Sequence, residues 1–321
     1  MSITVYFATN RVLIGPADQI QSYSAGIVSP SDPTALTYGT AFVEDANLTA
    51  DTSGAIRSIQ NVSKGWFNAD AIGDLSSPGR NLLLFVHGFD NSFENAITRA
   101  AFNKQWFAGA GVPAADTTVV AFSWPSLGKL LSFPVPWADY QSDQTMAGLS
   151  GPHFASFLTG LQPVLSKVRG SKRRTILLAH SMGNWALQSG VESWFAHGNR
   201  SPTPIFDEAI LAAADERYDS FGFPLHGRLS GLRLLANRIS VYFSRDDQAL
   251  HLSNTINLGA QRLGQEGPRD RSDAAQFPPA QYRMVDCAIY QDYDVTFASS
   301  HQYYRRSPSI RADIARIMTG P

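Results

Sequence analysis

A serine stands where a nucleophile would be exposed, at the end of an apolar run and directly before a helical pattern. The segment reads Ala179-His180-Ser181-Met182-Gly183, which is the nucleophile-elbow pattern G-x-S-x-G with alanine in the first place. The sharp turn of an elbow needs small residues two before and two after the serine, and alanine still meets that need. The helix behind Ser181 would direct N–H groups and its positive dipole end toward an anion. We predict that Ser181 is a nucleophile for acyl transfer; a helix-capping serine is the alternative.

A second segment could stabilise the oxyanion of such a reaction. Phe85-Val86-His87-Gly88-Phe89 ends another apolar run and precedes a helical pattern. In acyl-transfer enzymes of this architecture, one donor is the N–H after the nucleophile and the other comes from the loop after an earlier strand. Here these donors would be the backbone amides of Met182 and Phe89, and Gly88 permits the unusual conformation that aims such an amide inward. The alternative is a simple His-Gly turn.

A base and an acid are expected after the serine, in the chain order Ser, Asp or Glu, His. His301 follows the last apolar run and directly precedes the C-terminal helical pattern. His226 lies in a linker flanked by glycine and proline, and His251 lies inside a predicted helix. We therefore predict that His301 is the base, with an exposed loop histidine as the alternative.

Two aspartates compete for the role of the acid. Asp247 ends an apolar run in Ser244-Arg-Asp-Asp and leads directly into a helical pattern, which would hold its carboxylate at the end of the strand. Asp215 ends the preceding run and is followed by a long irregular segment. We favour Asp247 and keep Asp215 open; the aspartate that is not the acid would serve as a helix cap, as an aspartate at a strand–helix junction commonly does.

Eight apolar runs predict the strands that would position these groups. They span 3–8, 38–44, 81–87, 117–124, 175–180, 208–215, 238–244 and 282–290. The runs from 81 to 244 are continuous, as is typical of parallel strands covered on both faces. Helical patterns separate them, which indicates βαβ units and an α/β fold with a mostly parallel eight-stranded sheet. The first two runs lack a long connecting helix and are expected to form an antiparallel edge.

The helical patterns carry recognisable start and stop signals. Asn91 and Glu94 predict a capping box that opens a helix ending at Gly109. Pro163 is expected to kink a helix over 154–168. Two further helices are predicted over 182–196 and 248–263. No domain boundary is evident, so we expect a single domain over 1–321.

Residues 125–140 are too apolar for a bare loop. They carry three prolines among large apolar side chains, and we predict that they cap the site. The substrate pocket would then be lined by Trp124, Leu131, Phe133 and Trp137. The alternative is that these side chains pack on the outer helices.

Composition excludes several classes of function. The 26 basic and 27 acidic residues give a net charge of −1, which argues against nucleic acid or an anionic membrane as a partner. One cysteine, Cys287, excludes an internal disulfide framework and a cysteine-rich zinc site. The N-terminus does not resemble a signal peptide, and no apolar stretch approaches the ~18 residues that span a bilayer. We expect a cytoplasmic protein that is not integral to a membrane.

The order of these motifs resembles that of the α/β-hydrolase superfamily, and within it a bacterial group of α/β hydrolases of unknown function that are esterase- or lipase-like. The resemblance covers most of the chain. It rests on Ala8-Thr9-Asn10-Arg11, Tyr38-Gly39-Thr40, Phe85–Phe89, Phe122-Ser123-Trp124-Pro125, Ala179–Gly183, Ser244–Asp247 and Ser300-His301-Gln302-Tyr303-Tyr304. It implies a triad of Ser181, Asp247 and His301 and hydrolysis of esters or related acyl bonds.

The sequence therefore predicts a serine hydrolase that cleaves a small-molecule carboxylic ester through an acyl-enzyme, with neither metal nor cofactor. Three other reactions could use the same triad: those of a thioesterase, an amidase and an acyltransferase. A non-catalytic binding protein with the same fold is the alternative from a different class. Chain-length preference, and whether copies associate as a homo-oligomer, stay open.

Overall fold

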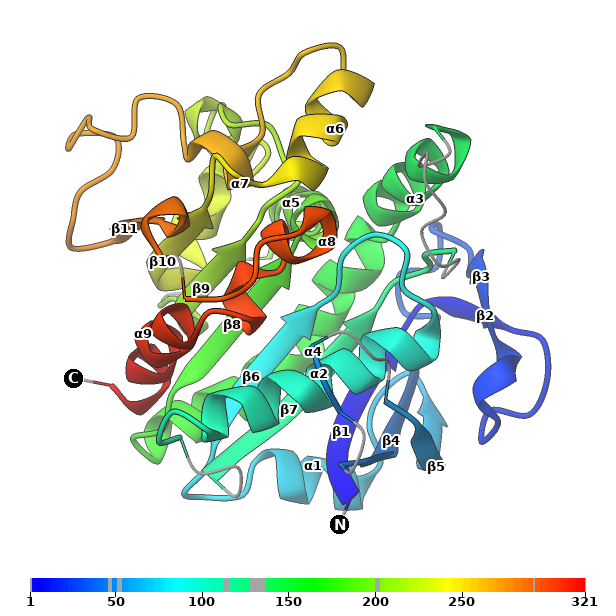
Figure 1. The fold of residues 1–321 in the computed structure, drawn as a ribbon. Helices are drawn as coiled ribbons and strands as arrows, with labels where there is room; N and C mark the ends of the chain where they lie inside the picture. Colours follow the sequence, from blue (N-terminus) through cyan, green and yellow to red (C-terminus); the bar gives the residue numbers. More distant parts are fainter. Residues whose placement is uncertain are drawn as a thin grey trace.

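The computed structural model describes residues 2–45, 48–50, 54–112, 116–127, 137–199, 203–290 and 292–320. In this part of the chain, nine strands form one twisted sheet (Figure 1). The strands are β1 (Ser2–Thr9), β4 (Thr37–Glu44), β5 (Ile56–Lys64), β6 (Asn81–Val86), β7 (Thr117–Ser123), β8 (Thr175–His180), β9 (Phe206–Ala212), β10 (Ala236–Phe243) and β11 (Tyr282–Asp286). Their order across the sheet is β11-β10-β9-β8-β6-β7-β1-β4-β5.

The sheet is parallel except at one edge. Every neighbouring pair from β11 to β1 is parallel, whereas β4 runs antiparallel to both β1 and β5. The α/β fold, the eight predicted strands and the antiparallel edge are thus confirmed. The predicted count of eight is wrong by one, because β5 was missed. Its sequence IRSIQNVSK is mostly polar, as suits an exposed edge strand.

Helices cover both faces of the sheet. In β6, Leu82 and Leu84 pack into one buried cluster, and Leu83 and Phe85 pack into the other. Figure 1 shows α2 and α9 in front of the sheet and α4 and α5 behind it. The helices are α1 (Ala69–Leu75), α2 (Phe93–Ala108), α3 (Trp137–Leu149), α4 (Gly151–Gly170), α5 (Gly183–Ala196), α6 (Gln248–Ile256), α7 (Leu263–Glu266), α8 (Phe297–Ser300) and α9 (Pro308–Thr319). None of the described helices is long and apolar enough to cross a membrane.

Two helix predictions need correction. The side chain that caps α2 belongs to Ser92, which accepts a hydrogen bond from the amide of Asn95, so the predicted cap at Asn91 is wrong. The helix predicted over 248–263 ends early, at Ile256, because the chain leaves the helical conformation at Leu258 and Gly259, where φ is 57° and 79°; the next helix, α7, begins only at Leu263. Pro163 lies inside α4, which continues through it.

A buried arginine connects the short second sheet to the loops beside β6 and β7. This sheet pairs β2 (Arg11–Leu13) with β3 (Tyr23–Ile27). The Arg11 guanidinium donates to the carbonyl oxygens of Ser24, Asn91 and Ser126 at 2.7–3.2 Å. Since these acceptors lie on three separate segments, Arg11 holds the loops at one side of the sheet in a fixed arrangement.

Candidate active site

Ser181 lies in a strained turn between β8 and α5. Its φ is 55°, a left-handed conformation that non-glycine residues rarely adopt. The Ser181 amide donates to the carbonyl oxygen of Ala212 at 3.0 Å, which ties the turn to the neighbouring strand. A Cβ atom on Gly183 would lie 2.5 Å from the carbonyl oxygen of His87, so only glycine fits where α5 begins against β6. The local geometry is that of a nucleophile elbow.

Three residues far apart in the chain meet at this turn. The Nε2 atom of His301 lies 2.8 Å from the Ser181 hydroxyl oxygen. The Nδ1 atom of His301 lies 2.7 Å from Asp247 Oδ2. His301 follows α8 and Asp247 follows β10, so the three side chains meet at the carboxyl edge of the sheet. Ser181, His301 and Asp247 thus form one continuous chain of hydrogen bonds.

Burial and charge shift the pKa values of this pair. Burial raises the pKa of the Asp247 carboxyl, whose side chain is inaccessible to solvent. Burial alone would lower the pKa of His301. The charge and hydrogen bond of Asp247 outweigh burial, so the pKa of His301 is raised above 6.5. The aspartate therefore favours the imidazolium form of its partner.

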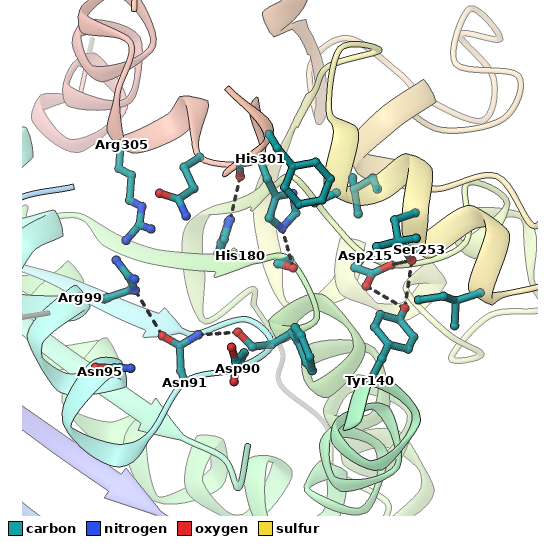
Figure 2. A pocket seen from close by; sticks show the side chains of 18 residues that line it. Asp90, Asn91, Asn95, Arg99, Tyr140, His180, Asp215, Ser253, His301 and Arg305 are labelled. Carbon is teal, nitrogen blue, oxygen red and sulfur yellow. Dashed lines mark hydrogen bonds between the residues drawn. The ribbon is translucent and has the colours of Figure 1, made fainter. Parts of the chain in front are cut away.

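Asp215, the competing acid, is occupied elsewhere. Its carboxylate accepts hydrogen bonds from Tyr140 Oη at 2.8 Å and Ser253 Oγ at 2.5 Å (Figure 2). The Nε atom of Arg262 lies 3.5 Å from Asp215 Oδ1. The structure therefore places Asp215 in a separate buried network beside the site, and Asp247 is the carboxylate that contacts His301.

The loop after β6 brings Gly88 close to Ser181, and Phe89 lines the same cavity as Ser181. The Asn91 side-chain amide donates to the carbonyl oxygens of Gly88 at 3.0 Å and Phe89 at 2.8 Å. In a trans peptide the N–H points away from the C=O, so holding the Gly88 carbonyl also orients the Phe89 N–H. A Cβ atom on Gly88 would lie 2.7 Å from the Ser181 Cβ, so glycine allows this close approach. Met182, whose amide is the other predicted donor, follows Ser181 directly.

Sequence reasoning missed two residues that support this arrangement. Asn91 is one, and its position two residues after Phe89 was interpreted as a helix cap. His180 is the other: its Nε2 donates to the carbonyl oxygen of His301 at 3.1 Å, and the two ring centroids are 4.9 Å apart. Burial and the neighbouring His301 lower the pKa of His180 well below 6.5, so it stays neutral. Its position beside Ser181 in the elbow was the only signal in the sequence.

These groups open into a cavity of about 330 Å³. It is lined by Phe89, Asp90, Asn91, Asn95, Arg99, Tyr140, His180, Ser181, Asp215, Ala249, Leu250, Leu252, Ser253, Ile256, Phe297, His301, Gln302 and Arg305. Most of these apolar side chains come from α6, with Phe89 and Phe297 in addition, and most of the polar ones come from 90–99 and from the segment around His301. No group of three or more metal-ligating side chains occurs among the described residues.

The two predicted pocket residues that the structure describes, Trp124 and Trp137, do not line this cavity. Trp124 is fully buried, stacks on His87 and donates from Nε1 to the His87 carbonyl at 2.7 Å, so it supports the loop from behind. Trp137 begins α3 and is 52% exposed. Leu131 and Phe133 lie outside the described residues. Among the described lining residues, most apolar side chains come from α6, a helix that the cap prediction did not consider.

Residues 63–319 match the family model described as "Alpha/beta hydrolase of unknown function (DUF900)". No curated protein has a matching sequence. Among solved structures, Aspergillus fumigatus lipase B is 13% identical with a TM-score of 0.43, covering 77% of this chain and 54% of its own. Pyrococcus horikoshii acylaminoacyl peptidase is 9% identical with a TM-score of 0.34, covering 88% of this chain and 47% of its own. The chain thus spans about half the length of each of these two proteins. Because the matched residues make up most of the chain, the protein belongs to this family of α/β hydrolases.

Proposed function

We propose that the protein is a serine hydrolase that cleaves carboxylic esters of small molecules through an acyl-enzyme. The observation that carries the proposal is the chain of hydrogen bonds from Ser181 Oγ through His301 to Asp247, with distances of 2.8 and 2.7 Å. A hydroxyl bonded to an imidazole that a carboxylate orients is the arrangement that activates a serine. Its position in a cavity of about 330 Å³ favours a small substrate.

In the first half of the proposed reaction, Ser181 Oγ attacks the ester carbonyl and His301 Nε2 takes the hydroxyl proton. Asp247 accepts a hydrogen bond from Nδ1–H of His301, so that Nε2 is the nitrogen free to take the serine proton. The same carboxylate stabilises the imidazolium that then forms. The amides of Phe89 and Met182 donate to the oxyanion, and one such donor is worth about 10²–10³ in rate. His301 then gives its proton to the departing alkoxide, which leaves Ser181 acylated.

In the second half, His301 Nε2 takes a proton from water, which attacks the acyl carbonyl. The bond between Ser181 Oγ and the acyl carbon breaks, and the serine recovers its proton from His301. The products are a carboxylic acid and an alcohol. Every proton transfer uses the same imidazole nitrogen, so the mechanism needs no group beyond those already described.

An ester is preferred to an amide on chemical grounds, because an alkoxide leaves more readily than an amine anion. A thioesterase, amidase or acyltransferase would use the same residues. These reactions are separated by comparing oxygen esters, thioesters and amides of one acyl group, and by adding a competing alcohol as acceptor. A non-catalytic binding protein would turn over none of them.

The decisive experiment is labelling with a fluorophosphonate probe followed by peptide mapping, together with turnover of 4-nitrophenyl butyrate. We expect a single label on Ser181, loss of that label in Ser181→Ala, and ester hydrolysis that the same variant lacks. A label on another residue, or turnover in Ser181→Ala near that of the wild type, would overturn the assignment of the nucleophile.

A further inference from the structure

Two arginines border the cavity that holds Ser181, and the proposed mechanism uses neither. Arg99 comes from α2, and Arg305 follows His301 by four residues. Both line the cavity, and Figure 2 shows their guanidinium groups pointing toward one another. Two like charges facing each other repel, so the arrangement needs a physical explanation.

Arg305 is nearly completely buried, with 2% of its surface exposed. Its Nε and Nη1 atoms have no hydrogen-bond partner among the described residues. A buried guanidinium without partners is costly, because the charge loses its hydration and gains nothing in return. Burial, and then the charge of Arg99, lowers the pKa of Arg305 to about 9, which still leaves it charged at neutral pH.

Among the described residues, no ion pair joins a carboxylate to Arg99 or Arg305. The acceptors that the described residues offer Arg99 are neutral: Asn91 Oδ1 at 3.2 Å and the Ala50 carbonyl oxygen at 3.5 Å. Asp215 also lines the cavity, but its carboxylate accepts hydrogen bonds from Tyr140 and Ser253 instead. Arg305 also borders a second, more open hollow that Asp294 lines, and it forms no ion pair there within the described chain. The Nε and Nη1 donors of Arg305 are therefore available to an anion that binds in the cavity.

We propose that Arg99 and Arg305 bind an anionic group, a carboxylate or a phosphate, on the ester that Ser181 attacks. This inference rests on the proposed function for its substrate. Guanidinium groups pair with carboxylates and phosphates through parallel N–H···O bonds. An anion between them would satisfy the free donors of Arg305 and relieve the repulsion. The substrate would then be an acidic ester, whereas a purely apolar one would leave the pair unsatisfied.

The first test compares charged and neutral esters on the wild-type enzyme. One pair carries the charge on the acyl group: 4-nitrophenyl hydrogen glutarate and 4-nitrophenyl pentanoate, which have the same number of acyl carbons. The other carries it on the leaving group: the butyrates of 4-hydroxybenzoate and of methyl 4-hydroxybenzoate. We expect a higher kcat/KM for the charged member of at least one pair, and that pair shows which side the arginines face. Preference for the neutral member in both pairs would overturn the inference.

The second test changes the arginine. Arg305→Met should lower the charged-to-neutral ratio of kcat/KM by roughly 10- to 100-fold, since a charge-assisted hydrogen bond is lost. Arg305→Lys should lower it less, because it keeps the charge but loses the planar fork. The matched control is Arg238→Met, which removes an exposed charge at the amino end of β10 and should leave the ratio unchanged. An unchanged ratio in Arg305→Met would contradict the inference.

A third measurement does not depend on turnover. In the Ser181→Ala background, glutarate or inorganic phosphate should raise the melting temperature, and the ion that does so identifies the chemistry of the site. Adding Arg305→Met should abolish the rise. If no ester is hydrolysed but the rise is present and depends on Arg305, the proposed function fails and the anion site stands. If neither ion raises the melting temperature of a protein that does hydrolyse esters, the anion site fails and the function stands.

Discussion

Asp247 uses its two carboxylate oxygens for two different partners, and His301 is one of them. Oδ2 lies 2.7 Å from His301 Nδ1, while Oδ1 accepts the amide of Leu250 at 3.0 Å and so caps α6. The N-cap bond fixes the carboxylate relative to a helix, and the carboxylate in turn fixes the imidazole. One side chain thereby couples the start of a helix to the orientation of the proposed base.

Replacing Asp247 by Asn tests which acid orients the base. Asn is as good an N-cap as Asp, so α6 should remain intact. The amide would favour the wrong tautomer of His301, and a comparable change in a serine protease costs about 10⁴ in kcat. We expect a loss of that order, measured as kcat on a neutral ester. Asp215→Asn is the matched control and should lose far less; a larger loss in the control would reverse the assignment.

The pH dependence of kcat/KM follows from the raised pKa of His301. The proposed base must be neutral, so activity should rise with pH and reach half its plateau above pH 6.5. Asp247→Asn removes the negative charge that raises this pKa, so its residual activity should have a lower midpoint. Profiles of kcat/KM against pH, measured between about pH 5 and 9 for the wild type and Asp247→Asn, give both midpoints. A wild-type midpoint well below 6.5 would contradict the pairing.

The same shift has a consequence for folding. Because the folded-state pKa of His301 is raised, its pairing with Asp247 stabilises the protein fully below the unfolded value near 6.5. This contribution is lost as the pH rises through the folded pKa. Activity and the stability from this pair should therefore change in opposite directions, which unfolding by denaturant across the same pH range can measure.

Asn91→Ala tests whether the loop after β6 must be held in place. The substitution removes the bonds to the carbonyls of Gly88 and Phe89, and His87 Nδ1, 2.9 Å from the Gly88 oxygen, then remains to hold the peptide that carries the Phe89 N–H. A whole oxyanion donor is worth about 10²–10³, so we expect kcat to fall by roughly 10- to 100-fold with a smaller change in KM. Asn95→Ala, on the same wall of the cavity, is the control. Equal effects of the two variants would show that Asn91 has no special role.

The conformation of Ser181 predicts an unusual order of stability. At φ = 55° a side chain costs roughly 1–2 kcal/mol that glycine avoids. Ser181→Gly should therefore be as stable as Ser181→Ala or more stable, by up to about 1 kcal/mol. At Ser189, in the middle of α5, the order should be reversed, because glycine destabilises helices by about 1 kcal/mol. Denaturant unfolding of the four variants measures both orders; a less stable Ser181→Gly would contradict the strain.

Much of this protein could be predicted from local patterns. Continuous apolar runs such as 81–87 and 175–180 indicated parallel strands, because a strand covered on both faces must be apolar at every position. The small residues around Ser181 indicated the elbow, because only such residues fit a turn that tight. Asp247 and His301 could be singled out because chain order and strand ends restrict where an acid and a base can meet. The edge strand β5 was not predicted, because its exposure to solvent leaves a mostly polar sequence in which the alternation of apolar residues is weak.

Other features depend on which segments meet in space, and no local pattern records that. Sequence reasoning placed Trp124 and Trp137 among the pocket residues, yet Trp124 packs behind the loop after β6, and α6 supplies most of the described apolar lining. The roles of Asn91 and His180 depend on carbonyl groups whose positions are known only once the chain is folded. Arg99 and Arg305 are two ordinary arginines about 200 positions apart in the sequence. Their two positive charges lie at one cavity only because α2 and the segment after His301 meet there in the fold. Local propensity determined the strands, the elbow and the order of the reactive groups; tertiary packing alone decided what surrounds them.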